Sequence, residues 1–159
     1  LEQNHEKALG LNRPVIERLV GDSLKIKAAI VNRDETEKGE RRKLNFGHTF
    51  GHAIERVTGI SHGEAVSAGM VMAALLSEKM GYLRRRSVEK IETLLVNLGL
   101  PTRMALNRKA VLNAVGKDKK WSGEKIHFVF LTDIGHAIVE EMGQTELERL
   151  TDEIDWPWR

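Results

Sequence analysis

Two helices that meet at a short turn are predicted by residues 44–81, LNFGHTFGHAIERVTGISHGEAVSAGMVMAALLSEKMG. The first helix should cover residues 45–58 and stop at Gly59, because glycine readily adopts the left-handed conformation that ends many helices. The second helix should begin near His62 and run to Gly81. Its residues are apolar on most sides, which indicates a helix buried at the centre of a helical bundle.

The segment before this pair predicts another helix and a loop. Asn12 and Pro14 form a helix start, since the missing N–H of proline costs nothing in the first turn. Apolar residues then recur at helical spacing through VIERLVGDSLKIKAAIVN, residues 15–32. The charged stretch RDETEKGERR, residues 33–42, predicts a loop.

The segment after the pair continues the helical pattern. Ser87 is expected to cap a helix that ends at Gly99. Asn107 should cap a shorter helix with the sequence RKAVLNAV. TELERLTDEI, residues 145–154, predicts a last, exposed helix.

The helical pattern is interrupted by a predicted β-hairpin. IHFVFL (126–131) and HAIVEE (136–141) contain β-branched and aromatic residues and flank the turn-like TDIG (132–135). The chain of 159 residues is long enough for one domain with a substantial core. The sequence thus predicts a single, mainly α domain over residues 1–159, with several helices and one small β-hairpin.

The composition excludes several classes of function. A formal net charge of +2 is too small to predict nucleic-acid binding, and no apolar run reaches the ~18 residues of a membrane-spanning helix. The chain has no cysteine, so any metal must take nitrogen and oxygen ligands. We therefore expect a cytoplasmic protein, with no nucleic acid and no membrane as partner.

The predicted helix pair carries three histidines. His48 and His52 lie four residues apart, hence on one helix face, and His62 opens the next helix. The spacing alone leaves a metal site, a proton-transfer site and a mere packing role open. The peptidase motif H-E-x-x-H is excluded because its glutamate is absent. Glu55 and Glu64 are close enough in sequence to orient a ring or to complete a metal shell.

Cationic and amide side chains lie before and after the histidines. Lys27, Arg41 and Asn45 precede them, and Lys119 and Lys120 follow in KDKK. Together these groups could receive a phosphorylated or carboxylated substrate. In a sequence with 30% charged residues, each of them could equally belong to the solvated surface.

Three segments, in this order, resemble a known enzyme family. They are DETEKGERRKLNFGHTFGHAIE (34–55), HGEAVSAGMVMAA (62–74) and KDKKWSGEKIHFVFLTDIGHAIV (117–139). The blocks around His48 and His62 are highly specific, and the likeness runs from about residue 12 to residue 150 without a large gap. The chain is similar to the C-terminal domain of the 3-dehydroquinate synthases.

The resemblance implies a carbon–oxygen lyase that needs NAD and zinc or cobalt. Such enzymes convert 3-deoxy-D-arabino-heptulosonate 7-phosphate into 3-dehydroquinate and phosphate in the shikimate pathway. NAD transiently oxidises a substrate hydroxyl, which acidifies the neighbouring proton so that phosphate can leave, while the metal acts as Lewis acid. The resemblance also implies that the full-length protein is a cytoplasmic homodimer.

The resemblance implies roles for individual residues. His48 and His62 match the two zinc-binding histidines of the family. His52 matches a histidine that contacts the phosphate end of the substrate and assists proton transfer. The positions that match substrate-binding residues are Lys27, Arg41, Asn45, Lys119 and Lys120, with Arg41 suited to the substrate carboxylate.

Two parts of the family pattern have no counterpart in this sequence. The third zinc ligand, a glutamate in a segment like A-E-V-I-K, would lie shortly before Leu1, and no glycine-rich nucleotide-binding half is present. We therefore expect a C-terminal fragment that lacks the NAD site, binds zinc weakly and has no synthase activity alone.

Three alternatives stay open beside this interpretation. Other sugar-phosphate cyclases, such as 2-deoxy-scyllo-inosose synthase and amino-dehydroquinate synthase, share the metal motif, although Arg41 favours a carboxylate-bearing substrate. Iron- or zinc-dependent alcohol dehydrogenases also carry histidine ligands on a helical domain, but HGEAV and the lysine segment favour the synthases. The third alternative is a non-catalytic helical domain used for binding or assembly.

Overall fold

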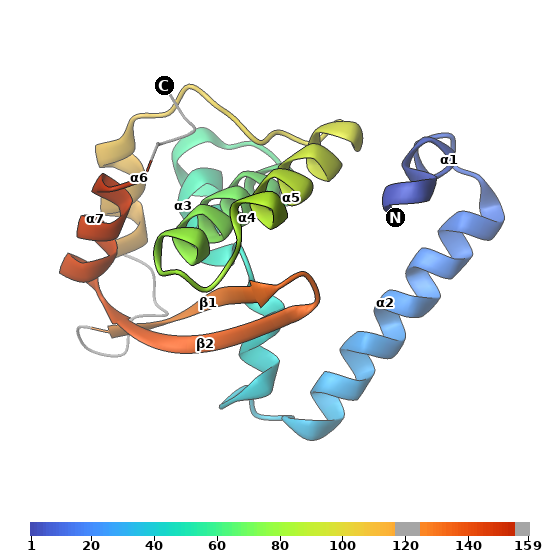
Figure 1. Cartoon of the computed structure of the whole chain (residues 1–159), viewed down its shortest axis with the longest axis horizontal. Helices are drawn as coiled ribbons and strands as arrows, with labels where there is room; N and C mark the ends of the chain where they lie inside the picture. The colour runs from blue at the N-terminus through green and yellow to red at the C-terminus, as the bar shows by residue number, and fades with distance from the viewer. Residues whose placement is uncertain (117–124, 155–159) are drawn as a thin grey trace.

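The structure is a computed structural model that describes residues 1–116 and 125–154 (Figure 1). These residues form, in chain order, η1 (Glu2–Asn4), α1 (His5–Leu9), α2 (Arg13–Arg33), η2 (Glu40–Asn45), α3 (His48–Thr58), α4 (His62–Lys79), α5 (Arg85–Asn97), α6 (Arg108–Gly116), β1 (Lys125–Asp133), β2 (His136–Gly143) and α7 (Gln144–Asp152), where η marks a 3-10 helix. The mainly α fold with one β-hairpin is therefore confirmed. No helix of the described part is both long and apolar enough to cross a bilayer.

Helix α4 lies at the centre of the fold, as its apolar sequence predicts. Most of its residues from Ala65 to Ser77 are buried, and α3, α5, α7 and β1 all pack against it. Its start is held by a capping box, in which the side chains of Ser61 and Glu64 accept hydrogen bonds from each other's backbone N–H groups. His62, the first residue of α4, therefore lies at a well-defined helix end.

The predicted hairpin is present, with a tighter turn. Strands β1 and β2 pair antiparallel, with Val129 opposite Val139 in the middle of the ladder. The predicted turn covered residues 132–135, but only Ile134 and Gly135 separate the two strands. The strands are therefore longer than the sequence pattern indicated.

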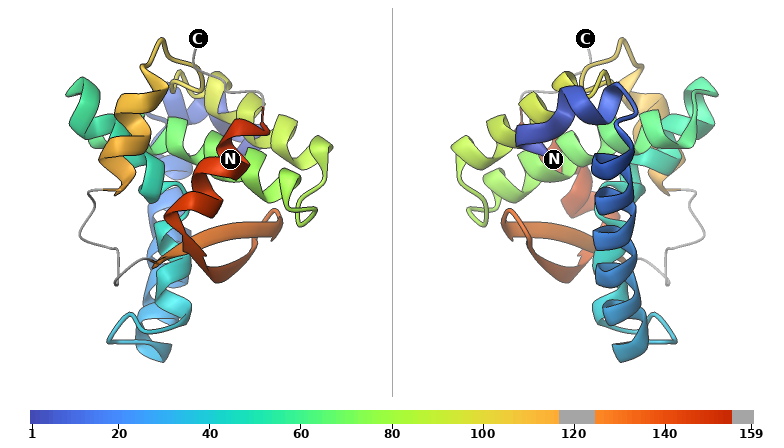
Figure 2. Two further views of the ribbon diagram at one scale, coloured as in Figure 1. Left: turned by 90° about the vertical axis from the view of Figure 1, so that its left-hand side faces the viewer. Right: turned by 90° about the vertical axis from the view of Figure 1, so that its right-hand side faces the viewer.

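The hydrophobic core lies between the hairpin and the helices. Helices α3, α4, α6 and α7 gather on one side of the hairpin in two perpendicular directions of view (Figures 1 and 2). The hydroxyl oxygen of Ser77 on α4 accepts a hydrogen bond from the backbone N–H of Leu131 at 3.0 Å, which ties α4 to β1. The largest buried side chains of this core are Phe50, Ile54, Met72, Leu76, Phe128, Phe130 and Leu147.

Helix α2 stands apart from the rest of the molecule along most of its length (Figure 1). Asn12 caps its start, as predicted, by accepting a hydrogen bond from the N–H of Val15 at 3.4 Å. None of its residues is buried, and Val20, Leu24 and Ile26 are more than half exposed. The predicted helix is therefore present, but these three apolar side chains stay largely uncovered by the described elements.

The first residues form η1 and α1, which the sequence pattern did not predict. Helix α1 packs against α2 and α5. Lys90 of α5 forms an ion pair with Glu2 at 2.9 Å. The N-terminal turn therefore closes back onto the body of the domain.

The boundaries of α3 and of the loop before it differ from prediction. The predicted helix 45–58 begins only at His48, because η2 precedes it and Gly47 adopts a φ of +81°, which interrupts the helical path. The predicted loop over 33–42 is also shorter, since α2 includes Arg33 and η2 begins at Glu40.

The start of α5 differs as well. Arg84 precedes the first helical residue, Arg85, and Ser87 lies buried in the first turn instead of capping the helix. The next residue, Val88, packs against Leu83 in a small buried cluster. The first turn of α5 therefore faces the core, which rules out the predicted capping role of Ser87.

The last two helices contain one confirmed and one wrong prediction. Asn107 caps α6 by accepting a hydrogen bond from the N–H of Ala110 at 3.0 Å, as predicted. The prediction of an exposed α7 is wrong, because Leu147 and Leu150 are buried in the core. Helix α7 is amphipathic and covers one end of the core.

Candidate functional site

Helices α3 and α4 cross in direct backbone contact, which fixes the positions of the histidines. A Cβ atom added at Gly69 of α4 would stand 2.1 Å from the carbonyl oxygen of Gly47 and 2.6 Å from the backbone nitrogen of Gly51. These distances leave no room for a side chain. Glycine at this crossing therefore lets α3 lie directly against the first half of α4.

The crossing brings three imidazole rings together. The ring centres of His48 and His52 lie 5.5 Å apart, those of His48 and His62 also 5.5 Å, and those of His52 and His62 5.8 Å. His62 is exposed, and the other two histidines are half-buried. The three predicted residues thus share one place in the fold, while their individual roles stay predictions.

Two of the rings are oriented by hydrogen bonds from Nδ1. His62 Nδ1 donates to Glu55 Oε2 at 2.9 Å, and His48 Nδ1 donates to the carbonyl oxygen of Phe46 at 3.3 Å. Because carboxylate and carbonyl oxygens only accept, the proton of each neutral ring lies on Nδ1 and the lone pair on Nε2. Nε2 is then the nitrogen that can bind a metal ion.

The donor atoms fit zinc in kind and in spacing. Zinc binds imidazole nitrogen at about 2.1 Å, which places the centres of two rings on one tetrahedral ion roughly 5 Å apart. The 5.5 Å between His48 and His62 is close to this value. Among residues 1–116 and 125–154, however, no group of three or more His, Cys, Asp or Glu side chains is arranged to hold a metal ion. The histidines therefore fit an incomplete metal shell.

Glu64 does not supply the further ligand that such a shell needs. Its Oε2 accepts hydrogen bonds from the hydroxyl of Ser61 at 2.6 Å and from the backbone N–H of Ser61 at 3.1 Å. These two bonds, the hydroxyl bond first, lower the pKa of Glu64 below its usual value. The carboxylate of Glu64 therefore acts as a helix cap, and Glu55 is the carboxylate that contacts a histidine.

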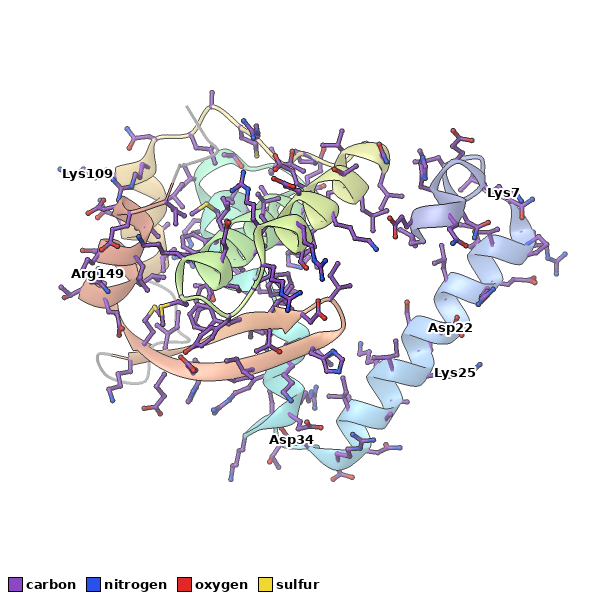
Figure 3. The ribbon with its side chains drawn as sticks, viewed as in Figure 1. Lys7, Asp22, Lys25, Asp34, Lys109 and Arg149 are labelled. Carbon is purple, nitrogen blue, oxygen red and sulfur yellow. The ribbon has the colours of Figure 1, made fainter. Side chains whose placement is uncertain are left out.

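The loop between α2 and η2 is organised by Asp34, which lies at the bend between them (Figure 3). Its carboxylate accepts backbone hydrogen bonds from Lys38 at 3.1 Å, Gly39 at 2.7 Å and Arg41 at 3.0 Å. The bonds from Arg41 and Gly39 hold the pKa of Asp34 below its ordinary value. The ionised carboxylate of Asp34 therefore holds the loop backbone that carries Arg41.

Arg41 and Asn45, both predicted to bind substrate, meet at Glu37. The Oε1 of Glu37 accepts a hydrogen bond from Asn45 Nδ2 at 2.7 Å, and its Oε2 lies 3.8 Å from Arg41 Nε. Arg41 Nη1 also donates to the carbonyl oxygen of Glu35 at 2.9 Å. The carboxylate of Glu37 thus links the amide of Asn45 to the guanidinium of Arg41.

Sequence reasoning missed both organising carboxylates. Asp34 left a readable signal, because an aspartate in a polar loop often closes a turn by a bond from its side chain to the backbone. Glu37 left none. Its φ of +55° is left-handed, which a glutamate sequence does not suggest, and its partners depend on that turn of the backbone.

The remaining predicted site residues are lysines. Lys27 is exposed on α2 and so lies on a different element from the three histidines. Helix α2 stands apart from α3 and α4, which explains the separation (Figure 1). Lys119 and Lys120 lie outside the described residues.

The sequence matches the family model described as 3-dehydroquinate synthase C-terminal over residues 1–121. It is 42% identical over 147 residues to the 3-dehydroquinate synthase of Coxiella burnetii (strain Dugway 5J108-111), which covers 89% of this chain and 41% of that protein. It is 43% identical over 153 residues to the 3-dehydroquinate synthase of Halorhodospira halophila, covering 93% of this chain and 43% of that protein. The chain spans about two fifths of the length of these curated relatives.

Solved structures with the same fold are sugar-phosphate cyclases. A 2-deoxy-scyllo-inosose synthase in complex with carbaglucose-6-phosphate, NAD+ and Co2+ superposes with a TM-score of 0.67 at 23% identity, over 81% of this chain and 39% of that one. The 2-epi-5-epi-valiolone synthase of Streptomyces hygroscopicus, with NAD+ and Zn2+, gives a TM-score of 0.65 at 23% identity, over 88% of this chain and 39% of that one. At this identity the likeness establishes the fold alone. With the histidine crossing in place and the family model matched over residues 1–121, the chain belongs to the 3-dehydroquinate synthase C-terminal family.

Proposed function

We propose that this chain is the metal- and substrate-binding part of a 3-dehydroquinate synthase of the shikimate pathway. The full enzyme would convert 3-deoxy-D-arabino-heptulosonate 7-phosphate into 3-dehydroquinate and phosphate. The observation that carries the proposal is the meeting of three imidazole rings, with centres within 5.8 Å, in a chain of this family. Zinc or cobalt, when bound, would supply a Lewis acid, and NAD would supply the hydride acceptor.

The histidines would divide the work between them. His48 and His62 would hold the metal through Nε2, because a hydrogen bond from Nδ1 orients each ring. His52, on the same face of α3 as His48, would contact the phosphate end of the substrate and move a proton there. A third protein ligand would come from outside the described residues.

Anion-binding side chains would orient the substrate. Arg41 would bind the carboxylate, since a guanidinium offers two parallel N–H donors, and Asn45 would hydrogen-bond a hydroxyl nearby. The proposed contacts to phosphate and to the rest of the substrate come from Lys27, Lys119 and Lys120. The shared carboxylate of Glu37 supports a common orientation of Arg41 and Asn45.

A second candidate is another sugar-phosphate cyclase, such as a 2-deoxy-scyllo-inosose synthase. That enzyme shares the fold of this chain. Arg41 speaks for the first candidate, because heptulosonate phosphate carries a carboxylate and a hexose phosphate does not. We also propose that the full-length protein is a cytoplasmic homodimer.

A chimeric enzyme tests the function. The 159 residues replace the matching C-terminal part of the Coxiella burnetii synthase, and phosphate release is followed with heptulosonate phosphate, NAD and zinc. We expect turnover that His48→Ala abolishes, with glucose 6-phosphate inert. A chimera that folds by circular dichroism but releases no phosphate contradicts the proposal. Turnover of glucose 6-phosphate alone would establish the second candidate.

A further inference from the structure

We infer that Glu55 is a positioning residue, which holds His62 in the one tautomer that can bind a metal ion through Nε2. The inference rests on the proposed role of His62 as a zinc ligand. The geometry behind it is the 2.9 Å hydrogen bond from His62 Nδ1 to Glu55 Oε2. Glu55 itself would not touch the metal or the substrate.

The hydrogen bond joins two different helices across a short turn. Glu55 lies in the last turn of α3, and His62 is the first residue of α4. Their side chains are 40% and 53% exposed, so burial does not force them together. Their separation is set instead by the backbone contact at Gly69, which fixes α3 against α4. The crossing of the two helices therefore sets the position of Glu55, and Glu55 in turn orients the ring of His62.

The choice of tautomer follows from the acceptor. A carboxylate opposite Nδ1 requires the proton on Nδ1, whereas neutral imidazole in water carries its proton mainly on Nε2. Without Glu55, the exposed ring of His62 would revert to the Nε2–H form and would have no lone pair on the metal-binding nitrogen. Loss of such an outer partner typically weakens metal binding 10- to 100-fold.

Glu64 offers the natural comparison, because it is the other carboxylate close to His62 in the sequence. Its Oε2 accepts hydrogen bonds from the hydroxyl and the backbone N–H of Ser61, so it acts as a helix cap. Glu64→Gln keeps a capping residue at this position, since glutamine also serves in the capping box. It therefore makes a matched control for Glu55→Ala and Glu55→Gln.

The first measurement uses the metal-free 159-residue chain. Long-range 1H–15N NMR spectra report which ring nitrogen of His62 carries the proton. We expect the Nδ1–H form in the parent chain, in Glu55→Gln, whose amide oxygen still accepts, and in Glu64→Gln. Glu55→Ala should shift His62 to the Nε2–H form. An unchanged tautomer in Glu55→Ala would overturn the inference without touching the proposed function.

The second measurement is a Co2+ titration of the same four proteins, followed by the visible absorption of the bound ion. The Kd should rise 10- to 100-fold in Glu55→Ala and change less than about 3-fold in Glu64→Gln. An equal loss in both variants would show a merely structural effect and overturn the inference. A parent chain that binds no Co2+ while Glu55→Ala still shifts the tautomer would overturn the metal role of His62, and with it the function assigned to Glu55.

Discussion

Gly69 on α4 and Gly47 at the start of α3 touch through their backbones: a Cβ at Gly69 would stand 2.1 Å from the carbonyl oxygen of Gly47. This contact fixes the crossing of the two helices that carry His48, His52 and His62. Any side chain between the helices would separate the rings and loosen the core at the same point.

Gly69→Ala should therefore destabilise the fold strongly. Overpacking a tight crossing costs about 1–3 kcal/mol and occasionally more, so we expect a loss of about 3 kcal/mol in the free energy of unfolding, measured in urea. Gly63→Ala is the matched control, because it lies in the same helix with open space around it. It should leave stability unchanged or raise it by up to about 1 kcal/mol. Equal effects of the two changes would contradict the backbone contact.

Two buried serines of α4 should respond in opposite directions to replacement by alanine. The hydroxyl of Ser77 donates to the carbonyl of Ala73 at 2.6 Å and accepts from the N–H of Leu131 at 3.0 Å. The hydroxyl of Ser67 is buried and has no hydrogen-bond partner among the described residues. Ser77→Ala should cost about 1–3 kcal/mol of unfolding free energy, and Ser67→Ala should be neutral or stabilising. A destabilised Ser67→Ala protein would show that its hydroxyl has a partner in solution.

Asp34 should remain ionised to lower pH than an ordinary aspartate. Its folded-state pKa is lowered from 3.8, chiefly by the N–H groups of Arg41 and Gly39. A lowered carboxyl pKa contributes stability above pH 3.8, and this contribution is lost as pH falls through the folded-state pKa. NMR titration should show the amide resonance of Gly39 moving with a midpoint below 3.8, and Asp34→Asn should abolish that step. A titration midpoint at or above pH 3.8 would contradict the hydrogen bonds from the backbone N–H groups to the Asp34 carboxylate.

Neighbouring arginines should differ in their effect on substrate binding. Arg41→Lys removes the bidentate donors proposed for the carboxylate, so KM for heptulosonate phosphate in the chimera should rise ~10-fold or more, because a hydrogen bond to a charged group contributes about 1.5–3 kcal/mol. Arg42 Nε donates to the backbone oxygen of Glu37 at 3.0 Å, and Arg42→Lys should change KM less than about 3-fold. Equal KM changes in the two variants would argue against a carboxylate site at Arg41.

Local signals in the sequence predicted the parts of the fold that depend on local physics. The apolar residues on most sides of α4 predicted its burial. Asn12 and Asn107 cap α2 and α6 through hydrogen bonds to residues three positions later in the chain. Such bonds depend on a few adjacent residues, which a sequence displays directly. The sequence also predicted the histidine cluster, because His48 and His52 share one face of a helix and His62 opens the next helix after a short turn.

Other features depend on contacts that no local pattern displays. Ser87 resembles a cap, but Val88 beside it packs against Leu83 and draws that turn of α5 into the core. The apolar residues of α2 predicted the helix itself, but not that Leu24 would be 60% exposed, because the spacing of residues does not show which side chains other elements will cover. The role of Glu37 depends on a left-handed backbone that only the surrounding loop imposes.

The central claim is that His48 and His62 form part of a metal site. Isothermal titration of the 159-residue chain with Zn2+ tests it most directly, with the exposed His136→Ala as control. We predict one site with a Kd of about 1 μM or weaker, since the shell lacks a ligand, and its loss in His48→Ala and in His62→Ala. Absence of binding, or binding that both variants retain, would contradict the claim.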